Sequence, residues 1–379
     1  MKSKLGIYVH VPFCVRKCLY CDFCSDTNLD SELVAKYFRA LNEEINLYRH
    51  MAGDYVTDSI FIGGGTPSAV DSRYIDELMN HLNKWFEIDR NCEITIEANP
   101  GTIDIPKARD YIYSGLNRMS VGVQTLNDQL LKKIGRIHNA EEAEKTLSDI
   151  HQAGFLNVSV DLMFNLPDQR LKDVTADIDK ILKHDINHIS YYSLKVEENT
   201  PFHKMLKNNQ IQLGSDEQER EIYHRIIEML GNRGFKQYEI SNFSMPGYES
   251  RHNMKYWSRE SYLGLGLSSH SFIGQERFSN TTNLHEYIHN LLDQRLSRSE
   301  GEIIQGKDII WEYLILGLRK TKGIQVEAFR IIAGSHYHEY RKILNKLEMN
   351  GLIEFDATCF RLTSLGMDLS NTVFVELLI

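Results

Sequence analysis

Residues 10–24 read HVPFCVRKCLYCDFC and place four cysteines within eleven residues, at Cys14, Cys18, Cys21 and Cys24. The first three form the spacing C-x3-C-x2-C, which offers three thiolates to one iron–sulfur cluster. A four-iron cluster held in this way keeps one iron without a protein ligand, so a small molecule can bind that iron directly. This segment is therefore the candidate reaction site.

Two other interpretations of the cysteines stay open at this point. Thiolates also bind zinc, and Cys24 could complete a closed site with four ligands. Ferredoxin-type clusters also take four cysteines. The neighbouring side chains favour a reactive cluster over a structural metal site. An aromatic, partly apolar wall shields a reactive intermediate, whereas a site that only holds a surface loop together does not need one. That wall consists of Tyr8, His10, Phe13, Tyr20 and Phe23.

The overall composition is that of an ordinary globular protein, with 379 residues, 42% hydrophobic and 25% charged. The net charge of −9 argues against a general nucleic-acid binder, which needs a basic face for phosphates. Four of the six cysteines lie in one segment, which favours ligation in a reducing compartment over a disulfide framework. No stretch approaches the roughly 20 apolar residues of a membrane span. We therefore expect a cytoplasmic protein without a membrane span.

Short β-rich runs alternate with amphipathic helical stretches in the first half of the chain. We expect strands at 6–11, 59–63, 93–98, 118–124, 158–164 and 188–194. We expect helices between them at Ser31–Met51, Asp71–Phe86, Ala140–Ala153 and Leu171–His184. This alternation predicts an α/β fold with a parallel sheet and helical crossovers. Periodicity alone does not separate a full or partial barrel from an open doubly wound sheet.

Polar residues stand at or just beyond the ends of four predicted strands. They are Gly63–Thr66, Glu97, Gln124 and Asp161. In parallel α/β folds ligands collect at the carboxyl ends of the strands. The cysteine segment follows the first strand and belongs to the same edge, so we expect one site to gather all of these residues.

From about residue 303 the pattern changes to three helices followed by a short β-hairpin, an order that resembles a winged helix. Residues 303–379 contain nine Lys or Arg and nine Asp or Glu, so this part is neutral. A neutral winged helix is expected to pack against its own chain or a protein partner rather than DNA. We therefore divide the chain into residues 1–245, a connecting segment 246–302, and residues 303–379.

A second signal is FIGGGTPS, residues 61–68, in which three glycines follow a predicted strand. Such a run lets the backbone approach a ligand closely and present N–H groups to an anion. Alone it is weak, since a tight β-to-α turn also explains it and it lacks the Lys of a phosphate-binding loop.

Taken together, C-x3-C-x2-C with an aromatic before the third cysteine and GGGTP resemble the radical S-adenosylmethionine (SAM) superfamily. The resemblance runs nearly the whole length, through YVHVPFC, ITIEANPGT, NRMSVGVQTLND, VDLMFNLPDQ and SYYSLKVEENTPF. These segments are similar to the group that contains the oxygen-independent coproporphyrinogen III oxidases and the related HemW-like heme chaperones. The resemblance implies an α/β fold with a partial (β/α)6 radical SAM barrel in residues 1–245 and a small winged-helix-like C-terminal domain.

The resemblance also implies which residues bind cofactors. Cys14, Cys18 and Cys21 would hold a [4Fe–4S] cluster, and SAM would chelate the fourth iron through its amino and carboxylate groups. The positions that match the SAM pocket are Tyr8, Tyr20, Gly64, Gly65, Thr66, Glu97 and Arg136. Gln124 and Asp161 also match pocket positions, and they would contact either the same SAM or a neighbouring ligand. Glu97 suits ribose hydroxyls and Arg136 suits the methionine carboxylate. The structural alternative is that Glu97 and Asp161 cap helices.

Residues 251–259, RHNMKYWSR, bear on the choice of function. They combine His252 with Tyr256, Trp257 and three basic residues. A heme needs an axial ligand, a planar apolar surface and cations for its propionates, and all three types are present. A structural loop, whose aromatic side chains pack against the sheet and whose charges face water, explains the composition of this segment as well. The H-N-x-x-Y-W pattern resembles the motif associated with heme binding in the heme-chaperone group, so His252 is the candidate for the heme contact.

Two features depart from the oxidase pattern. The oxidases carry a further cysteine two residues after the third, where this chain has Phe23, and Cys24 is displaced by one residue. The chain also has only seven residues before Tyr8, whereas the oxidases have a longer N-terminal extension that helps to enclose substrate. Both departures weaken an oxidase assignment. Asn165 stands where relatives usually have glycine and is expected to alter only a local turn.

The sequence therefore predicts a heme chaperone that binds the cluster, SAM and heme or a porphyrin, and passes heme to an acceptor protein. A small electron-donor protein is a further expected partner. The alternative is a coproporphyrinogen III oxidase (dehydrogenase) of porphyrin biosynthesis, which decarboxylates propionates through a 5′-deoxyadenosyl radical. A DNA-binding regulator with a redox-sensing cluster is disfavoured by the neutral C-terminal part and the full SAM pocket, so no nucleic-acid partner is expected.

Overall fold

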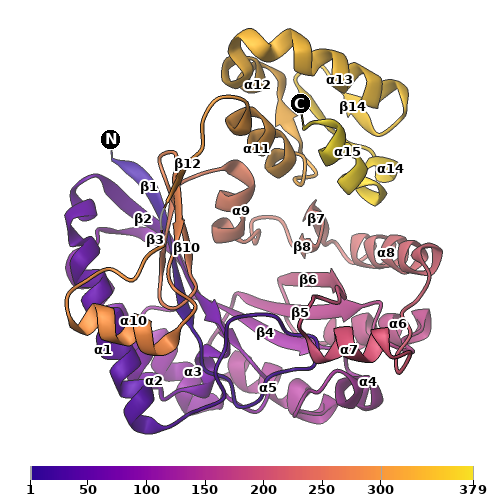
Figure 1. The fold of residues 1–379 in the computed structure, drawn as a ribbon. Coiled ribbons are helices and arrows are strands. Elements are labelled where there is room, and N and C mark those ends of the chain that lie inside the picture. The colour runs from indigo at the N-terminus through magenta and orange to yellow at the C-terminus, as the bar shows by residue number, and fades with distance from the viewer. Residues whose placement is uncertain (1, 300, 379) are drawn as a thin grey trace.

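The computed structural model describes residues 2–299 and 301–378, and its first half alternates strands and helices (Figure 1). Six strands pair in parallel in the order of the chain. They are β1 (Ser3–Val11), β2 (Tyr55–Gly64), β3 (Ile88–Ala98), β4 (Arg118–Gln124), β5 (Val158–Phe164) and β6 (His188–Ser193). The helices between them are α1 (Ser31–Tyr48), α2 (Ser72–Trp85), α3 (Ile105–Tyr113), α4 (Asp128–Lys133), α5 (Ala140–Ala153) and α6 (Leu171–Ile181). The predicted α/β class is confirmed.

These six strands are the middle of a twelve-stranded mixed sheet, in the order β12-β11-β10-β9-β1-β2-β3-β4-β5-β6-β8-β7. β9 (Tyr262–Leu265) pairs in parallel with β1, and β10 (His270–Ile273), β11 (Glu276–Ser279) and β12 (Glu302–Ile303) follow antiparallel. At the other edge lie β8 (Asn242–Ser244) and β7 (Lys236–Glu239). The segment 246–302 thus adds strands to the main sheet. The sheet forms a partial barrel that does not close.

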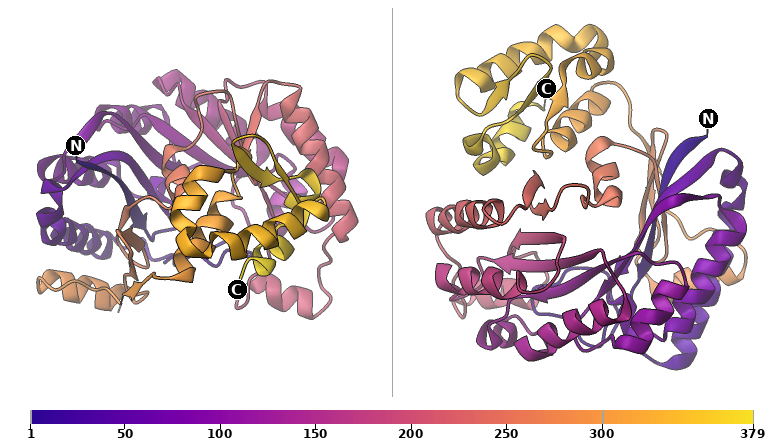
Figure 2. Two further views of the ribbon diagram at one scale, coloured as in Figure 1. Left: turned by 90° about the horizontal axis from the view of Figure 1, so that it is seen from above. Right: turned by 180° about the vertical axis from the view of Figure 1, so that it is seen from behind.

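Alternating side chains fix the two faces of each central strand. On β1, Leu5, Ile7, Val9 and Val11 are fully buried. Burying each such side chain contributes on the order of 2 kcal/mol. The helices between the parallel strands cover the outer face of the sheet (Figure 2), and α2 turns its apolar stripe inward after Asp71 caps its first turn. This packing fixes the register of the strands, and with it the positions of the side chains on the inner face.

After β6 come two helices, α7 (Pro201–Lys207) and α8 (Asp216–Gly231), and later α9 (Arg251–Ser258) and α10 (Leu284–Leu292). Among the described residues no helix has the length and apolar composition needed to cross a membrane.

The C-terminal domain has a hydrophobic core of its own, in which Leu314, Phe329, Tyr340, Leu344 and Phe360 are buried together. Its elements are α11 (Lys307–Gly317), β13 (Ile324–Gln325), α12 (Val326–Ala333), α13 (Tyr337–Met349), β14 (Ile353–Phe355), β15 (Cys359–Leu362), α14 (Ser364–Asp368) and α15 (Ser370–Glu376). The predicted three helices and hairpin are confirmed. The short strand β13, which pairs with β15, and the last two helices were not predicted.

Helix α9, which carries the H-N-x-x-Y-W pattern, lies between the sheet and the C-terminal domain (Figures 1 and 2). On the sheet side, the buried Lys255 ammonium lies 2.7 Å from an oxygen of Asp58 on β2. On the domain side, the guanidinium of Arg319 stacks 4.4 Å from the centre of the Trp257 ring. The motif therefore joins the two parts of the protein.

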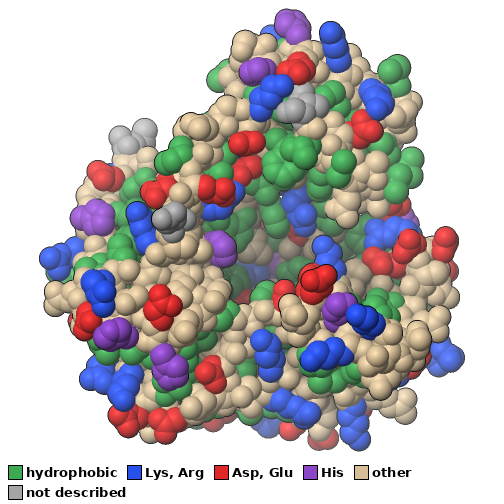
Figure 3. All heavy atoms as spheres, viewed as in Figure 1, with side chains coloured by type: hydrophobic (Ala, Val, Ile, Leu, Met, Phe, Trp, Pro, Cys, Tyr) green, Lys and Arg blue, Asp and Glu red, His purple; other side chains and the backbone are tan. Residues whose placement is uncertain are grey.

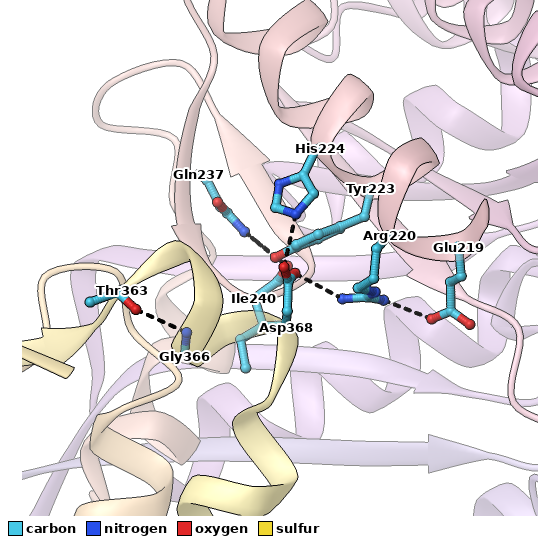
Figure 4. A network of polar contacts seen from close by, with 9 residues as sticks. All are labelled: Glu219, Arg220, Tyr223, His224, Gln237, Ile240, Thr363, Gly366 and Asp368. Atoms are coloured by element: carbon cyan, nitrogen blue, oxygen red, sulfur yellow. Dashed lines mark hydrogen bonds and ion pairs between the residues drawn. The ribbon is translucent and has the colours of Figure 1, made fainter. Parts of the chain in front are cut away.

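A second contact between the domains involves Asp368 on α14 (Figure 4). Its carboxylate accepts hydrogen bonds from Nε2 of His224 at 2.9 Å and from Nη1 of Arg220 at 3.4 Å, both on α8. Arg220 also pairs with Glu219, and Glu219 accepts a bond of 2.8 Å from the amide of Asn165. The loop after β5 is thus connected to the C-terminal domain through α8.

Asn165 adopts a left-handed backbone conformation with φ of 59°. Glycine and asparagine adopt this conformation at low cost, which explains why asparagine can stand here. Unlike glycine, its side chain also bonds to the backbone N–H of Gly214 and to Glu219.

Candidate functional site

The three cysteines of the C-x3-C-x2-C spacing line one cavity of about 330 Å³, which we call the cysteine cavity. All three are free thiols. The segment leaves β1 and is held by two backbone bonds, from Cys14 N–H to the Asp26 carbonyl at 2.8 Å and from Asp26 N–H to the Pro12 carbonyl at 2.7 Å. The loop is therefore fixed at the carboxyl end of the sheet, where the sequence predicts it.

The surroundings of the thiols favour protonation in the free protein. Burial raises the pKa of the Cys14 thiol, and burial raises that of Cys21 to about 11. At Cys14 a donor opposes this effect, because Oγ1 of Thr66 lies 3.6 Å from the sulfur. A second donor, Nη1 of Arg136, lies 3.6 Å from the Cys18 sulfur. A cluster that binds here must displace the thiol protons, and these donors stabilise the resulting sulfur charge.

Cys24 lies apart from the other three cysteines. It lines a second cavity, and its thiol lies 3.7 Å from the carbonyl oxygen of Thr282. Across residues 2–299 and 301–378, no three His, Cys, Asp or Glu side chains converge as a site for a single metal ion. Because Cys24 lines the other cavity, the cysteine cavity receives three thiols, the number that a cluster with an open iron requires.

The glycine run packs directly against the cysteine loop. The amide of Gly65 donates to the Val11 carbonyl at 2.9 Å, and that of Thr66 donates to the Phe13 carbonyl at 2.7 Å. A Cβ on Gly65 would lie 2.8 Å from that Phe13 oxygen, so a larger residue would push the two loops apart. Gly64 has a φ of 110°, which only glycine adopts readily. The glycines thus form a cradle beside the thiols.

Two carboxylates face the cysteine cavity from neighbouring strands. Glu97 at the end of β3 accepts a hydrogen bond of 3.1 Å from the amide of Gly64. Burial, with a further contribution from the charge of Asp161, raises the pKa of Glu97 to about 8. Burial also raises the pKa of Asp161, whose oxygens accept bonds of 3.1 and 3.2 Å from Ser120. Both groups can accept hydrogen bonds from a polar ligand.

Arg136 supplies a cation to the same cavity. Its guanidinium donates to Oδ1 of Asn99 at 2.6 Å and to the Gly122 carbonyl, besides its contact with Cys18. Its Nε is buried and has no hydrogen-bond partner among the described residues. Neutral groups thus hold the guanidinium in place, and within the described part of the chain no carboxylate hydrogen-bonds to it, so its charge is available to an anionic ligand.

Most of the residues predicted for the SAM pocket meet in the cysteine cavity. Those that line it are Cys14, Cys18, Tyr20, Cys21, Gly64, Gly65, Thr66, Glu97, Gln124, Arg136 and Asp161. Tyr8 lines the second cavity instead, where its hydroxyl lies 3.0 Å from Nδ1 of His10. Asn99, Ser120 and Tyr192 also line the cysteine cavity and were not predicted. Asn99 follows Glu97 by two residues in ITIEANPGT, so its position after a strand was the available signal.

His252 lies in neither cavity. It is 1% exposed, and its two ring nitrogens are already paired, Nδ1 with Oγ of Ser59 at 3.0 Å and Nε2 with the hydroxyl of Tyr256 at 2.9 Å. Burial, with the nearby charge of Lys255, lowers the pKa of His252 to about 3. A direct bond from His252 to a heme iron, as the sequence suggested, would require one of these contacts to break.

The cysteine cavity fits a [4Fe–4S] cluster and SAM by its donor set. It combines three free thiols, a glycine cradle, two carboxylates and a guanidinium with an unpaired buried nitrogen. Thiolates are the ligands of iron–sulfur clusters, and a guanidinium pairs with a carboxylate such as that of SAM.

Comparisons with known proteins identify the family of this chain. The family model for the Radical SAM superfamily matches residues 8–181, and that for the HemN C-terminal domain matches residues 304–369. The chain is 36% identical over 369 residues to the heme chaperone HemW of Bacillus subtilis, covering 97% of each chain. It is 32% identical over 373 residues to the heme chaperone HemW of Lactococcus lactis, covering 98% of this chain and 97% of that relative.

Among solved structures, the coproporphyrinogen III oxidase HemN of Escherichia coli, a radical SAM enzyme, superposes with a TM-score of 0.86 at 22% identity. The match covers 99% of this chain and 90% of that one and shows a shared fold. From its full-length relatives, its domain matches and its fold, the chain belongs to the HemW heme-chaperone family of the radical SAM superfamily.

Proposed function

We propose that this protein is a heme chaperone that holds a [4Fe–4S] cluster through Cys14, Cys18 and Cys21, binds SAM, and passes heme to an acceptor protein. One observation carries the proposal. Three free thiols, a carboxylate and a guanidinium face one cavity in a chain that is similar over nearly its whole length to proteins named heme chaperone HemW.

The residues of the cysteine cavity would divide the parts of SAM among them. Arg136 would pair with its carboxylate, Glu97 would accept bonds from the ribose hydroxyls, and Gly64 and Gly65 would leave room for the ligand beside the thiols. SAM, when bound, supplies ligands to the iron that no cysteine holds. Asp161, which lines the same cavity, would offer a further hydrogen-bond acceptor to the ligand.

Heme is the cargo of the proposed function. Its partners would be a heme-acceptor protein and a small electron-donor protein for the cluster, and the place of action would be the cytoplasm. The net charge of −9 and the neutral C-terminal domain argue against a nucleic-acid partner.

The coproporphyrinogen III oxidase is the alternative that a test must exclude, because that activity uses the same fold. One difference in this chain favours the chaperone. Phe23 occupies the position two residues after Cys21, and the thiol of Cys24 lies in the second cavity rather than beside the cluster cysteines.

The test is an anaerobic reconstitution of the protein, with iron and sulfide analysis, followed by a hemin titration monitored at the Soret band. Saturation near one heme per chain, followed by transfer of that heme to apomyoglobin, is the expected result. A Cys14→Ser variant should lose iron and sulfide, and it provides the comparison without an intact cluster. Conversion of coproporphyrinogen III to protoporphyrinogen IX by the wild type would establish the oxidase instead.

A further inference from the structure

The second cavity, of about 370 Å³, lies between β1, the cysteine loop, α9 and the turn from β9 to β10. We call it the tyrosine cavity, because Tyr8, Tyr256 and Tyr262 line it. Its volume is within the range of about 300–1,000 Å³ that small-molecule sites occupy. The face of the molecule in Figure 3 is hollowed in its middle, beneath the C-terminal domain, with hydrophobic side chains around the opening.

The walls of the tyrosine cavity suit a flat, apolar ligand. Tyr256 and Tyr262 meet edge to face with their ring centres 4.6 Å apart. Phe23 lines the same cavity and is 63% exposed, so its ring is available to pack on a ligand. Aromatic faces bury a planar macrocycle well and lose little conformational entropy on doing so.

Among the residues that line this cavity, two are histidines, and only one has a free ring. His10 is engaged at both nitrogens, since Nδ1 lies 3.0 Å from the Tyr8 hydroxyl and Nε2 lies 2.8 Å from the Cys24 carbonyl. His270 at the start of β10 is exposed, and within residues 2–299 and 301–378 no hydrogen bond or ion pair involves its imidazole. Its ring can therefore take a new partner without losing an existing one.

The position of His270 follows from two glycines in the sequence GLGLSSH, residues 264–270. A Cβ on Gly264 would lie 2.2 Å from the His270 carbonyl oxygen, and a Cβ on Gly266 would lie 2.4 Å from the carbonyl oxygen of His10. Neither contact is possible for a larger residue. The glycines thus let the β9–β10 turn pack onto β1, which brings His270 to the mouth of the tyrosine cavity.

We propose that the tyrosine cavity is the heme site of this protein and that the imidazole of His270 is a ligand of the heme iron. This inference rests on the proposed function, and it replaces His252 as the iron ligand. Neutral imidazole is a common ligand of heme iron.

The H-N-x-x-Y-W motif would then act on the heme through Tyr256 rather than through its histidine. Tyr256 lines the cavity, and its hydroxyl is held by Nε2 of His252. His252 is therefore a positioning residue for one wall of the site. The Lys17 ammonium, which lines the cysteine cavity, donates to the carbonyl of Phe23 at 2.9 Å, and Phe23 lines both cavities. This ammonium would be a candidate partner for a heme propionate.

The test compares hemin titrations of the anaerobically reconstituted wild type and the variants His270→Ala, His252→Ala and His289→Ala. His289 is the matched control, because it is an exposed histidine on α10 outside both cavities. We expect His270→Ala to bind hemin at least tenfold more weakly with a shifted Soret band, at unchanged iron and sulfide content. Added imidazole should restore the wild-type Soret band in His270→Ala, because it supplies the missing ligand.

The outcomes separate the site from the function. A wild type that binds no hemin would contradict the proposed function itself. A wild type that binds hemin while His270→Ala keeps the same affinity and spectrum would overturn this site and leave the chaperone function standing. Imidazole rescue of His252→Ala instead of His270→Ala would return the ligand role to His252.

Discussion

Nε2 of His252 and the hydroxyl of Tyr256 lie 2.9 Å apart, one turn from each other on α9, while Nδ1 of the same ring is 3.0 Å from Oγ of Ser59 on β2. The imidazole thus ties a helix from late in the chain to the inner face of an early strand. In the sequence His252 resembles a ligand, but in this structure its ring hydrogen-bonds α9 to β2.

Replacing His252 with alanine should destabilise the protein by about 2–4 kcal/mol, because it leaves a cavity and two hydroxyls without their partner. Urea unfolding followed by circular dichroism measures the change. His289→Ala, which alters an exposed ring, should leave the midpoint within error. An unchanged midpoint for His252→Ala would show that the two hydrogen bonds of the His252 ring do not stabilise the fold.

Gly65→Ala should disrupt cluster assembly. The new Cβ would lie 2.8 Å from the Phe13 carbonyl oxygen, which is backbone and cannot rotate away, so the cysteine loop must shift. We expect the reconstituted variant to hold less than half of the wild-type iron while its circular dichroism spectrum is unchanged. Gly231→Ala is the matched control, since an added Cβ there meets no atom within 4 Å. Full iron content in Gly65→Ala would mean that the cysteine loop can move away from the new Cβ without losing the cluster.

The raised pKa of Glu97 predicts how the stability of the folded protein changes with pH. Burial raises the pKa of Glu97 to about 8 in the folded protein, whereas an unfolded glutamate titrates near about 4.3. Between these values the folded state keeps a proton that the unfolded state releases, so this group lowers the stability of the fold as pH rises. Glutamine has no such proton, and its carbonyl oxygen can still accept the bond from Gly64.

The melting temperature of Glu97→Gln should therefore exceed that of the wild type at pH 8, with a smaller difference at pH 5. Scanning calorimetry of the protein without cluster or SAM measures both differences. The same difference at both pH values would indicate that Glu97 titrates in its usual range.

Glu312 on α11 holds the C-terminal domain to the sheet. Its carboxylate accepts a bond of 3.0 Å from Nε of Arg259 and one of 2.7 Å from Nη1 of Arg277, and its side chain is only 8% exposed. Removing it takes the carboxylate away from the half-buried Arg259 and leaves Arg277 only its longer contact with Glu302, which costs about 1–3 kcal/mol at this partly buried site. Glu312→Ala should therefore unfold in two calorimetric steps and be cleaved faster by trypsin between the domains.

The control for this experiment is Glu327→Ala, which removes an exposed carboxylate paired with Arg330 within α12. Surface pairs of this kind contribute about 0–1 kcal/mol, so its unfolding should match the wild type. A single transition in Glu312→Ala at the wild-type temperature would show that other contacts suffice to hold the domain.

The sequence predicted the central part of the fold because its signals are local. Each parallel strand contains several apolar or β-branched residues close together, and Glu97 and Asp161 could be assigned to one site because parallel strands share an orientation. Asp161 was predicted near the end of its strand but lies in the middle of β5. The strands from β7 to β12 have at most four residues each and carry no readable period, so their addition to the sheet was not predicted.

The role of α9 could not be read from its sequence for a different reason. RHNMKYWSR is polar by composition, and its burial depends on partners that lie far away in the chain, including Asp58 for Lys255 and Arg319 for Trp257. The same applies to Asn99, which meets Arg136 across 37 residues of sequence. A motif states which residue types are present, while tertiary contacts decide which of them remain free to bind.

Phe23 lines both the cysteine cavity and the tyrosine cavity. One aromatic ring is thus a shared partition between two ligand volumes. A ligand that displaces this ring on one side changes the space on the other, and the binding free energies of the two ligands become coupled. Thermodynamic linkage makes that coupling equal in both directions, so whatever one occupant does to the affinity of the second, the second does to the first.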